Sequence, residues 1–459
     1  MVDQPRNHCL KICVAIVLSL LLQGYAVASS VPLLAERGTT MAREALEELQ
    51  AKGMYHLDVL LDNSAGKKIQ LLTAHPTVVN ENNLQLSVRF GKQVLEFQRY
   101  EYKAPTLPEY DSQYGAGKGI RPAVYWFGSK SYDRKAHFSS ASGAAFDPTN
   151  FIFLARRGDS LRGKMVVDGT LYLLEDVGNG KHAFLEVAVK NELPCLVEKD
   201  EAADAKNALA VNEKSPPVDE HSVIKVLLVN TLTAGWIQEP PVMNRMIDEL
   251  EFLNSTNRVY AIPVVYQVVQ LMNSGARDDI FHGGREILRD FRFAESAETK
   301  IVAQARERLG ADVVMVGAVS VFSKGVSYQA ARKETAYYVF NAKNPVGFTH
   351  QFGHLLGIEH GWNQGDPEFN PTYQHGFMFR YNGKDYPSIG YDKENCRGDN
   401  RCKYILYYSD PGNSWEGNPL GTYNRNNEVR RLTERAQIIE AFHPQAGRSQ
   451  LGNGFSLEP

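Results

Sequence analysis

Three histidines in the segment HQFGHLLGIEH, residues 350–360, constrain the fold more than any other feature of the sequence. His350 and His354 are four residues apart, so a helix places both imidazoles on one face, one turn apart. Gly357 follows, and a glycine can take the positive φ that ends a helix and reverses the chain. The reversal would bring His360 towards the same point. The spacing therefore predicts three imidazoles that converge on one metal ion.

Zinc is the metal that this set of donors favours. Three neutral imidazoles leave a fourth position open for water, which is the arrangement of a catalytic rather than a structural zinc site. The alternative is an amphipathic helix whose histidines pack in a core without metal. The full H-x3-H-x2-G-x2-H spacing favours Zn²⁺ bound by His350, His354 and His360.

The composition is that of an ordinary soluble globular protein, with 43% hydrophobic and 22% charged residues. At 459 residues the chain is long enough for two or three domains. The net charge is −3 and basic residues do not form a block. These features exclude a typical nucleic-acid interface.

The first residues have the layout of a secretory signal peptide. Arg6 and Lys11 precede an apolar run at residues 12–22, and the sequence AVASS supplies an A-x-A pattern that ends at Ala28. The run is short for a transmembrane helix, and a non-cleaved anchor is the alternative. We therefore expect cleavage after Ala28 and a secreted or periplasmic protein without a membrane span.

Export changes how the five cysteines are interpreted, because exported cysteines tend to pair. Cys9 and Cys13 lie in the predicted signal peptide. Cys396 and Cys402 are close in sequence, and we predict one disulfide between them. Cys195 is the remaining cysteine, and an odd thiol in an exported protein is notable.

Two domains and a linker are predicted after the signal peptide. Residues 31–198 read as a β-rich domain that opens with a helix within 31–52, and residues 199–220 read as a charged, Ala-rich linker. Residues 221–445 alternate strand and helix patterns, and 446–459 form a tail. In this second domain we expect strands at 223–231, 260–272 and 311–322 and helices at 239–256 and 295–310.

HQFGHLLGIEH resembles the HExxHxxGxxH zinc motif of the metzincin metallopeptidases. Further on, TYQHGFMFRY, a two-cysteine loop and KYILYYSDPGNSWEGNPLG are similar to the C-terminal part of secreted bacterial reprolysin-like (ADAM/adamalysin-type) metzincins. The likeness covers roughly residues 221–445. It implies an α/β (α+β) catalytic domain with a twisted mixed sheet and a zinc helix, preceded by a β-rich propeptide-like domain. It also implies a Zn²⁺ cofactor and peptide-bond hydrolysis by zinc-bound water.

Gln351 is the main departure from that family pattern, since these enzymes carry a glutamate there as general base. The amide of glutamine can hydrogen-bond water but is not a usable base near neutral pH. Loss of a positioned general base costs roughly 10²- to 10⁴-fold in rate. Glu359 does not obviously replace it, because it lies past the glycine turn. Metal binding should survive, because Gln351 is not a ligand position.

Other departures lie downstream of the third histidine. By resemblance, residues 386–391 correspond to the Met-turn of the family, with either Ile389 or no counterpart at the methionine position. Gly361 stands where reprolysin-like proteins usually carry aspartate, and the upstream family cysteines are absent. By resemblance, Tyr391 is a candidate oxyanion stabiliser, and a packed aromatic is the alternative.

Cys195 lies just before the predicted linker. In related zymogens a propeptide thiolate occupies the fourth zinc position and blocks water, and a thiolate is a good zinc ligand. The local sequence LPCLVEK does not match a standard switch motif. A buried small hydrophobic residue is the alternative role for Cys195.

These features together predict a secreted, zinc-binding protein of metalloendopeptidase type, a monomer, with weak or lost proteolysis. A peptide or protein would be its substrate. The alternative is a non-catalytic pseudoprotease that binds peptides or proteins. A third hypothesis is a domain without metal.

Overall fold

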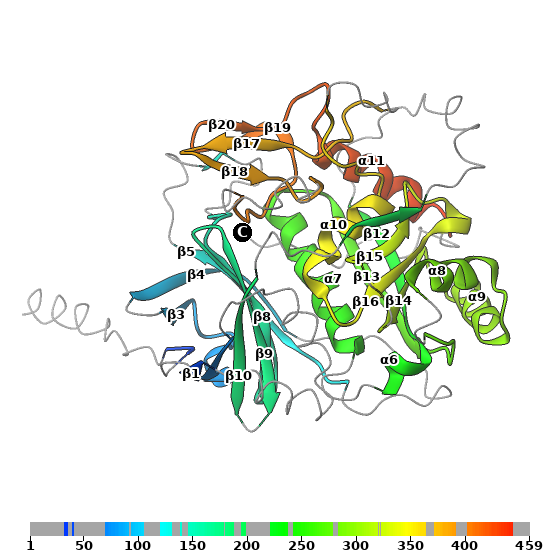
Figure 1. Ribbon diagram of the computed structural model, residues 1–459, viewed down its shortest axis with the longest axis horizontal. Helices are drawn as coiled ribbons and strands as arrows, with labels where there is room; N and C mark the ends of the chain where they lie inside the picture. The colour runs from blue at the N-terminus through cyan, green and yellow to red at the C-terminus, as the bar shows by residue number, and fades with distance from the viewer. Residues whose placement is uncertain are drawn as a thin grey trace, which may run out of the picture.

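The computed structural model of the chain describes residues 32–34, 39–40, 69–90, 93–104, 120–130, 138–139, 146–178, 180–187, 194–198, 221–236, 242–278, 283–319, 321, 323–363, 371–391 and 402–443. The predicted signal peptide, linker and tail lie outside these residues, as does most of the helix expected within residues 31–52. The described part is a sheet-rich α+β protein built on two large sheets (Figure 1).

The N-terminal half forms one antiparallel sheet of nine strands, in the order β1-β2-β10-β9-β8-β7-β5-β4-β3. Its strands follow the β-branched and aromatic runs of the sequence, and two-residue turns join β7 to β8 and β8 to β9. Asp168 and Gly169 both have positive φ, 47° and 71°, which is the two-residue hairpin turn that matches strand twist. The strands are β1 Thr39–Thr40, β2 Ile69–Thr73, β3 Gln85–Phe90, β4 Gln93–Lys103, β5 Val124–Lys130, β7 Phe151–Arg157, β8 Ser160–Val167, β9 Thr170–Gly178 and β10 Lys181–Val187.

The second half contains a mixed sheet of six strands, in the order β11-β15-β16-β14-β12-β13. Strands β12, β13, β14 and β16 pair in parallel, while β15 runs antiparallel to β16. The strands are β11 Leu196–Glu198, β12 Ser222–Asn230, β13 Val264–Asn273, β14 Val313–Ala318, β15 Gly325–Tyr328 and β16 Tyr337–Asn341. The helices are α6 Leu232–Trp236, α7 Val242–Val259, α8 Gly284–Phe293, α9 Ala297–Leu309, α10 Phe348–Leu355 and α11 Glu428–Glu440.

Helices cover both faces of this sheet. On β12, Leu227 and Val229 pack in one core with residues of α8 and α9, such as Ile287 and Val302. The alternate residues of β12 point the other way, into a larger core that includes α7, α10 and α11. Short strands lie over the top of the molecule in Figure 1. They are β6 Phe138–Ser139, β17 Met378–Tyr381, β18 Lys384–Pro387, β19 Asp410–Trp415 and β20 Asn418–Leu420.

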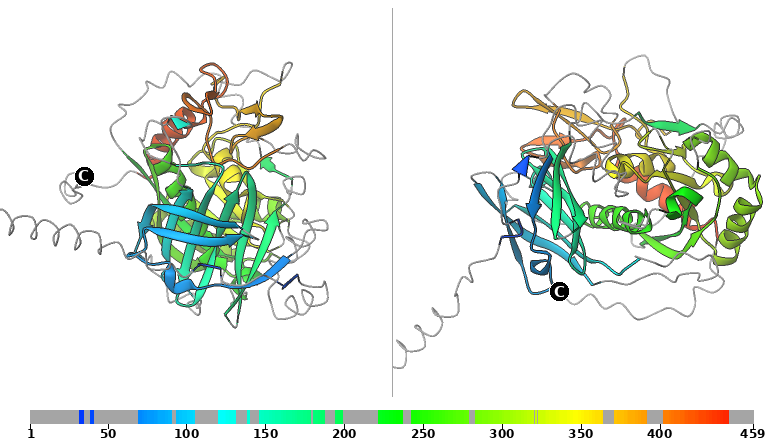
Figure 2. Two further views of the ribbon diagram at one scale, coloured as in Figure 1. Left: turned by 90° about the vertical axis from the view of Figure 1, so that its left-hand side faces the viewer. Right: turned by 60° about the horizontal axis from the view of Figure 1, so that its bottom comes forward.

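Helix α7 lies between the nine-stranded sheet and the six-stranded sheet (Figure 2). All but two of its 18 residues are buried, and the buried set includes Asp248, Glu249 and Glu251. Carboxylates are rarely buried unless they are paired. The structure supplies their partners from the strands of the N-terminal half.

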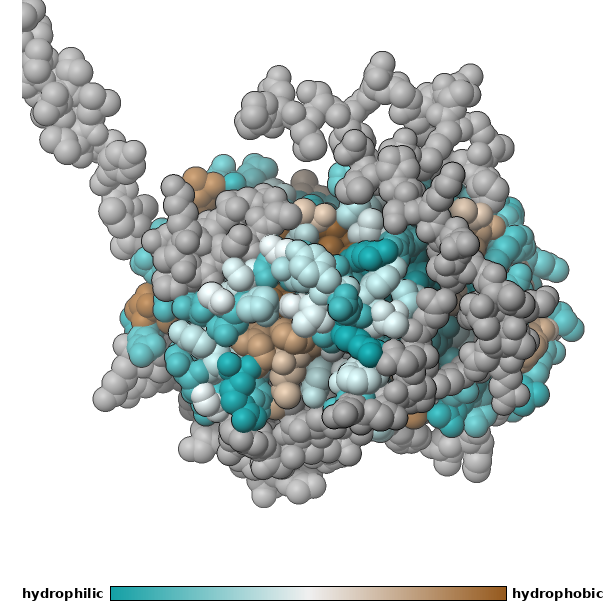
Figure 3. Space-filling model, turned by 90° about the horizontal axis from the view of Figure 1, so that it is seen from above, coloured by the Kyte–Doolittle hydropathy of each residue, from teal (hydrophilic) through white to brown (hydrophobic). Residues whose placement is uncertain are grey.

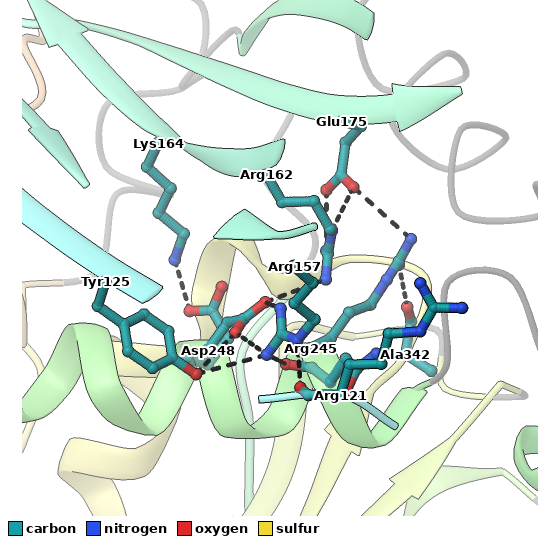
Figure 4. A network of polar contacts seen from close by, with 11 residues as sticks. Arg121, Tyr125, Arg157, Arg162, Lys164, Glu175, Arg245, Asp248 and Ala342 are labelled. Carbon is teal, nitrogen blue, oxygen red and sulfur yellow. Dashed lines mark hydrogen bonds and ion pairs between the residues drawn. The ribbon is translucent and has the colours of Figure 1, made fainter. Parts of the chain in front are cut away.

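A network of buried ion pairs joins α7 to strands β7, β8 and β9 (Figure 4). Asp248 receives bonds from Arg157 at 2.5 and 2.8 Å and from Arg162 at 3.3 Å. Arg162 also donates to Glu175 at 2.7 Å, and Lys164 pairs with Glu249 at 2.5 Å. The two halves are therefore connected by charges that are almost fully withdrawn from water.

Backbone hydrogen bonds also join the two halves. Strand β11, the last described segment of the N-terminal half, pairs in parallel with β15 at the edge of the second sheet. Strand β6 pairs with β19 near the C-terminus. The amide of Tyr404 donates to the Gly169 carbonyl at 2.7 Å. Backbone hydrogen bonds thus join the N-terminal half to the second half at three places.

Polar and apolar residues are both present on the surface. Seen from above, the described residues are mostly hydrophilic or neutral, with several small hydrophobic groups among them (Figure 3). Within the described residues, no helix combines the length and the apolar character needed to cross a bilayer.

Candidate metal centre

Helix α10 and the turn after it position the histidines. Phe348 and Phe352 pack into the core against Tyr338, which fixes the rotation of the helix about its axis. Gly357 has a φ of 84°, and its amide donates to the His354 carbonyl at 2.8 Å. A Cβ on residue 357 would lie 2.8 Å from the guanidinium of Arg431. The turn therefore requires glycine for its conformation and for its space, as the spacing of the motif predicts.

The structure brings His350, His354 and His360 together. Their ring centroids lie 4.7, 4.7 and 5.3 Å apart. The Nδ1 atom of His350 lies 2.7 Å from the Ile389 carbonyl, and that of His354 lies 2.7 Å from the Ile358 carbonyl. A carbonyl only accepts, so each Nδ1 carries the proton and each Nε2 presents a lone pair.

These lone pairs face each other in a way that fits a metal ion. The Nε2 atoms of His350 and His354 are 3.1 Å apart. Burial lowers the pKa of His354 to about 3, and burial followed by the nearby Lys324 ammonium lowers the pKa of His350 well below its usual value. Both rings are neutral at physiological pH, and two facing lone pairs repel unless a cation lies between them. Zn²⁺ accepts such a set of nitrogen donors.

Cys195 adds a sulfur to the three nitrogens. The ligating atoms of Cys195, His350, His354 and His360 all lie within 4.8 Å of one another. The Cys195 Sγ is 3.3 Å from the His354 Nε2. The thiol therefore lies beside the imidazoles and is only half-buried, which differs from a small hydrophobic residue packed in a core. A donor set of three nitrogens and one sulfur fits Zn²⁺.

Cys195 directly precedes strand β11, and the pairing of that strand holds the cysteine in this position. The Lys324 amide donates to the Pro194 carbonyl at 3.0 Å, and the Gln329 amide donates to the Glu198 carbonyl at 3.0 Å. These bonds extend the ladder between β11 and β15 at both ends. The segment therefore occupies the edge of the sheet next to the histidines.

Gln351 contacts the same segment with both ends of its amide. Its Nε2 donates to the Leu196 carbonyl at 2.6 Å, and its Oε1 accepts from the Cys195 thiol at 2.9 Å. The side chain is fully buried. A carboxylate at this position could not donate to the Leu196 carbonyl and would place a charge against it. The residue that departs from the zinc motif therefore holds β11 in place.

The turn below the histidines explains two further departures. Ile389 is buried, and it supplies to His350 a backbone carbonyl rather than its side chain. The ring of Tyr391 occupies the space that a Cβ on residue 361 would need. Gly361 is therefore required by Tyr391, and an aspartate would not fit there without displacing the ring.

Two residues next to the cluster were not predicted from the sequence. His375 donates from Nδ1 to the His360 carbonyl at 2.9 Å, and so supports the third histidine. Its place is set by backbone bonds between Glu359 and residues 374–376. Lys324 lines a pocket that also includes His350. Neither residue has a spacing relative to the motif that would have identified it.

Glu428 lies beneath the turn at residues 388–391 and is fully buried. Its carboxyl accepts from the Ser409 amide at 2.5 Å and fills the space beside Gly390, where a side chain would overlap it. Burial raises the pKa of Glu428 to about 7.

The raised pKa of Glu428 makes the stability of the protein depend on pH. The protonated carboxyl is favoured in the folded state, so its contribution is full below about pH 4.5 and is lost as pH rises through 7. The loss amounts to up to about 3 kcal/mol. Denaturation between pH 5 and 8 should show this decline for the wild type and a flatter profile for Glu428→Gln. Equal slopes for the two proteins would contradict the assignment.

The predicted disulfide stays a prediction. Cys402 is described, but Cys396 lies outside the described residues, and so do Cys9 and Cys13.

The donor set and its setting are those of a metallopeptidase-type protein, and sequence comparison supports this class. The chain is 25% identical over 334 residues to a peptidyl-Asp metalloendopeptidase of Stenotrophomonas maltophilia, covering 69% of this chain and 76% of the relative. It is 23% identical over 330 residues to a peptidyl-Asp metalloendopeptidase of Xanthomonas campestris pv. campestris, covering 69% and 75%. No protein-family model matches the chain.

Similarity to solved structures is weaker. Metalloproteinase-II from Bacteroides fragilis matches with a TM-score of 0.36 and 10% identity, covering 61% of this chain and 83% of that one. A chaperone–substrate complex matches with a TM-score of 0.37 and 18% identity, covering 49% of this chain and 36% of that chain. Likenesses at this level carry no weight for fold or function.

Proposed function

We propose that the chain is a zinc-binding protein of metalloendopeptidase type and of the reprolysin-like metzincin group, held latent by its own N-terminal half. The proposal is carried by one observation: the donor atoms of Cys195, His350, His354 and His360 all lie within 4.8 Å of one another. The relatives are named peptidyl-Asp metalloendopeptidases, which supports peptides that contain aspartate as the substrate class.

Each residue has a distinct part in this proposal. His350, His354 and His360 would hold Zn²⁺, and Cys195 would complete the set in the latent form. When bound, the metal would supply a Lewis acid that polarises the substrate carbonyl and acidifies water. Gly357 and the Ile389 carbonyl orient the imidazoles.

Gln351, Tyr391 and the edge of β15 would contact the substrate. Gln351 would hydrogen-bond the attacking water without removing a proton, so hydrolysis would be slow. Tyr391 lines the pocket that includes His350, and its hydroxyl is the candidate donor to the oxyanion. The edge of β15 that now pairs with β11 would pair with an extended peptide once β11 has left.

Zinc is expected to stabilise the protein. At a free concentration of 100 times its dissociation constant, zinc should raise the free energy of unfolding by about 2.7 kcal/mol, because it binds the folded site and not the unfolded chain. His354→Ala should lose the gain and the bound metal. The exposed His221 offers a matched control, and His221→Ala should keep both. Less than about one-tenth zinc per purified chain would favour histidines that pack without metal.

A non-catalytic, peptide-binding role is the second candidate. It is favoured by the two hydrogen bonds that Gln351 makes to Cys195 and Leu196, because they hold an extended segment of the chain beside the histidines. Tight binding of a peptide by the zinc form, without cleavage over hours, would support it.

The last part of the proposal is that the protein is exported. It rests on the signal-like sequence that ends at Ala28. A mature N-terminus at residue 29, read from protein recovered outside the cytoplasm, is the expected result, and an intact N-terminus in the cytoplasm would contradict it.

A further inference from the structure

The two halves of the protein share one hydrophobic core around Phe252 of α7. The Phe252 side chain is buried, and its ring centroid lies 6.3, 6.3 and 5.2 Å from those of Phe127, Phe151 and Phe153 on the nine-stranded sheet. These rings belong to the same cluster of buried residues as parts of β12, α10 and α11 in the second half. Apolar burial does not depend on a covalent link between the parts that meet, so this core can hold the sheet on α7 without the linker.

Buried ion pairs surround this core and resist separation of the halves. Asp248 pairs with Arg157 and Arg162 (Figure 4), and the Lys164 ammonium lies 4.5 Å from the centre of the Phe252 ring. If the sheet left α7, these contacts would break and the phenylalanine rings would enter water in the same step. Salt screens buried pairs far less than exposed pairs. The contact between the sheet and α7 should therefore survive at high salt.

Strand β11 is held less firmly than the sheet that precedes it. It has three residues, all half-buried, and lies at the edge of the six-stranded sheet beside β15. Its side-chain contacts include the ion pair of Glu198 with the exposed Arg285, and such exposed pairs stabilise little. Gln351 adds its bonds to Cys195 and Leu196. Short edge segments with few apolar contacts open at a small part of the free energy of global unfolding.

We propose that a cut between β11 and β12 opens the metal centre while the nine-stranded sheet stays on α7, so that the open protein is a complex of two chains. The proposal rests on the proposed function, since it states how that latent site is opened. The partner that α7 retains is residues 31–198 of the same chain. The cut is the hydrolysis of one peptide bond by another endopeptidase, in which water supplies the hydroxyl of the new carboxyl group and a hydrogen of the new amine.

The cut changes how β11 is tethered. In the intact chain β11 is joined at both ends, through residues 188–195 to β10 and through residues 199–221 to β12. After the cut only the first connection remains, so the strand is free to fray from β15 and to take Cys195 with it. The sheet keeps its contacts with α7, because the phenylalanines and cations that make them lie on β5, β7 and β8.

The test uses the full-length chain with a recognition sequence for a sequence-specific endopeptidase placed within residues 199–220. The cut protein is passed through a size-exclusion column at about 1 µM in about 0.5 M salt, where exposed ion pairs are largely screened. We expect the two fragments to co-elute in equal amounts at the size of the uncut chain, which corresponds to a dissociation constant below about 0.1 µM. Iodoacetamide should then label Cys195 about 10-fold or more faster than in the uncut chain, as read from its peptide by mass spectrometry.

Two buried phenylalanines give a matched pair of variants. Phe252→Ala removes the ring on which the sheet packs, so a larger share of the cut fragments should elute separately. Phe291 is equally buried, at 1% exposed, but lies in the core on the other face of the six-stranded sheet, with residues such as Ile287 and Val302. Phe291→Ala should therefore keep the fragments together. Circular dichroism before the cut shows whether both variants fold, and the wild-type result decides the question if they do not.

Separation of the wild-type fragments would overturn the two-chain complex, and so would fragments that stay together while Cys195 reacts no faster than in the uncut chain. Equal loss of co-elution in Phe252→Ala and Phe291→Ala would show that α7 does not hold the sheet. Zinc content of the uncut chain reports on the proposed function alone. A zinc-loaded chain whose fragments separate would leave the proposed function standing. A zinc-free chain whose fragments co-elute, with Cys195 exposed by the cut, would support the two-chain complex and contradict the zinc site.

Discussion

Gln351→Glu is expected to raise zinc-dependent peptidase activity by about 10²- to 10⁴-fold, measured after cleavage within residues 199–220 has let Cys195 and β11 leave the histidines. The substitution places a carboxylate next to the histidines, where it can accept the proton that an amide cannot. Cleavage of casein and of a quenched peptide that contains aspartate would measure the gain. Zinc content should stay the same, because residue 351 does not contribute a donor atom to the cluster.

The same substitution should also loosen β11. Glutamate cannot donate to the Leu196 carbonyl, so it loses the 2.6 Å bond that glutamine makes. We therefore expect faster proteolytic cutting near residues 199–220 in Gln351→Glu than in the wild type. Gln98 is exposed on β4, and Gln98→Glu controls for the change in charge. A wild type as active as Gln351→Glu would show that the amide does not limit the chemistry.

Asp248→Ala is expected to lower the free energy of unfolding by about 3–5 kcal/mol. The substitution leaves the guanidiniums of Arg157 and Arg162 buried without the carboxylate that neutralises them. Chemical denaturation at pH 7 would measure the loss. Burial already lowers the pKa of Arg245 in the same network to about 9, which shows how strongly this interior resists further positive charge.

A surface aspartate provides the comparison for Asp248. Asp159 lies exposed in the turn between β7 and β8, and Asp159→Ala should change stability by less than about 0.5 kcal/mol. If Asp248→Ala were as mild as Asp159→Ala, water would have to reach the arginines, and the two halves would not be held together by buried charge.

Local patterns predicted β12, β13, β14, α7 and α9 of the second half, but not α8, β15 or β16. Strand β12 was expected at 223–231 and spans Ser222–Asn230, and helix α9 was expected at 295–310 and spans Ala297–Leu309. Both have signals within their own residues, such as the capping box at Ser296. Helix α7 was expected three residues early, at 239–256. No pattern within the helix predicts that Asp248 and Glu249 are buried, because their cationic partners lie 91 and 85 positions away.

The spacing of residues predicted only the part of the site that is continuous in sequence, whereas Cys195 was a candidate from the family resemblance. His350, His354, Gly357 and His360 form one motif, and the structure brings the three imidazoles together. The contact between Cys195 and Gln351 joins residues 156 positions apart, and the pairing of β11 with β15 depends on the whole intervening fold. No local pattern specifies such pairings, and none predicts that Lys324 and His375 lie beside the histidines.

The ion pairs between α7 and the N-terminal sheet affect how the chain folds as it is synthesised. The N-terminal half is synthesised first, so the strands that carry Arg157, Arg162 and Lys164 exist before residues 242–259 have been added. Until then these cations face water, and the sheet lacks the helix that completes its core. If the second half were made alone, Asp248 and Glu249 would lack the cations with which they pair in the full chain. We therefore expect residues 221–459 to fold poorly by themselves and to recover when residues 31–198 are supplied as a separate chain.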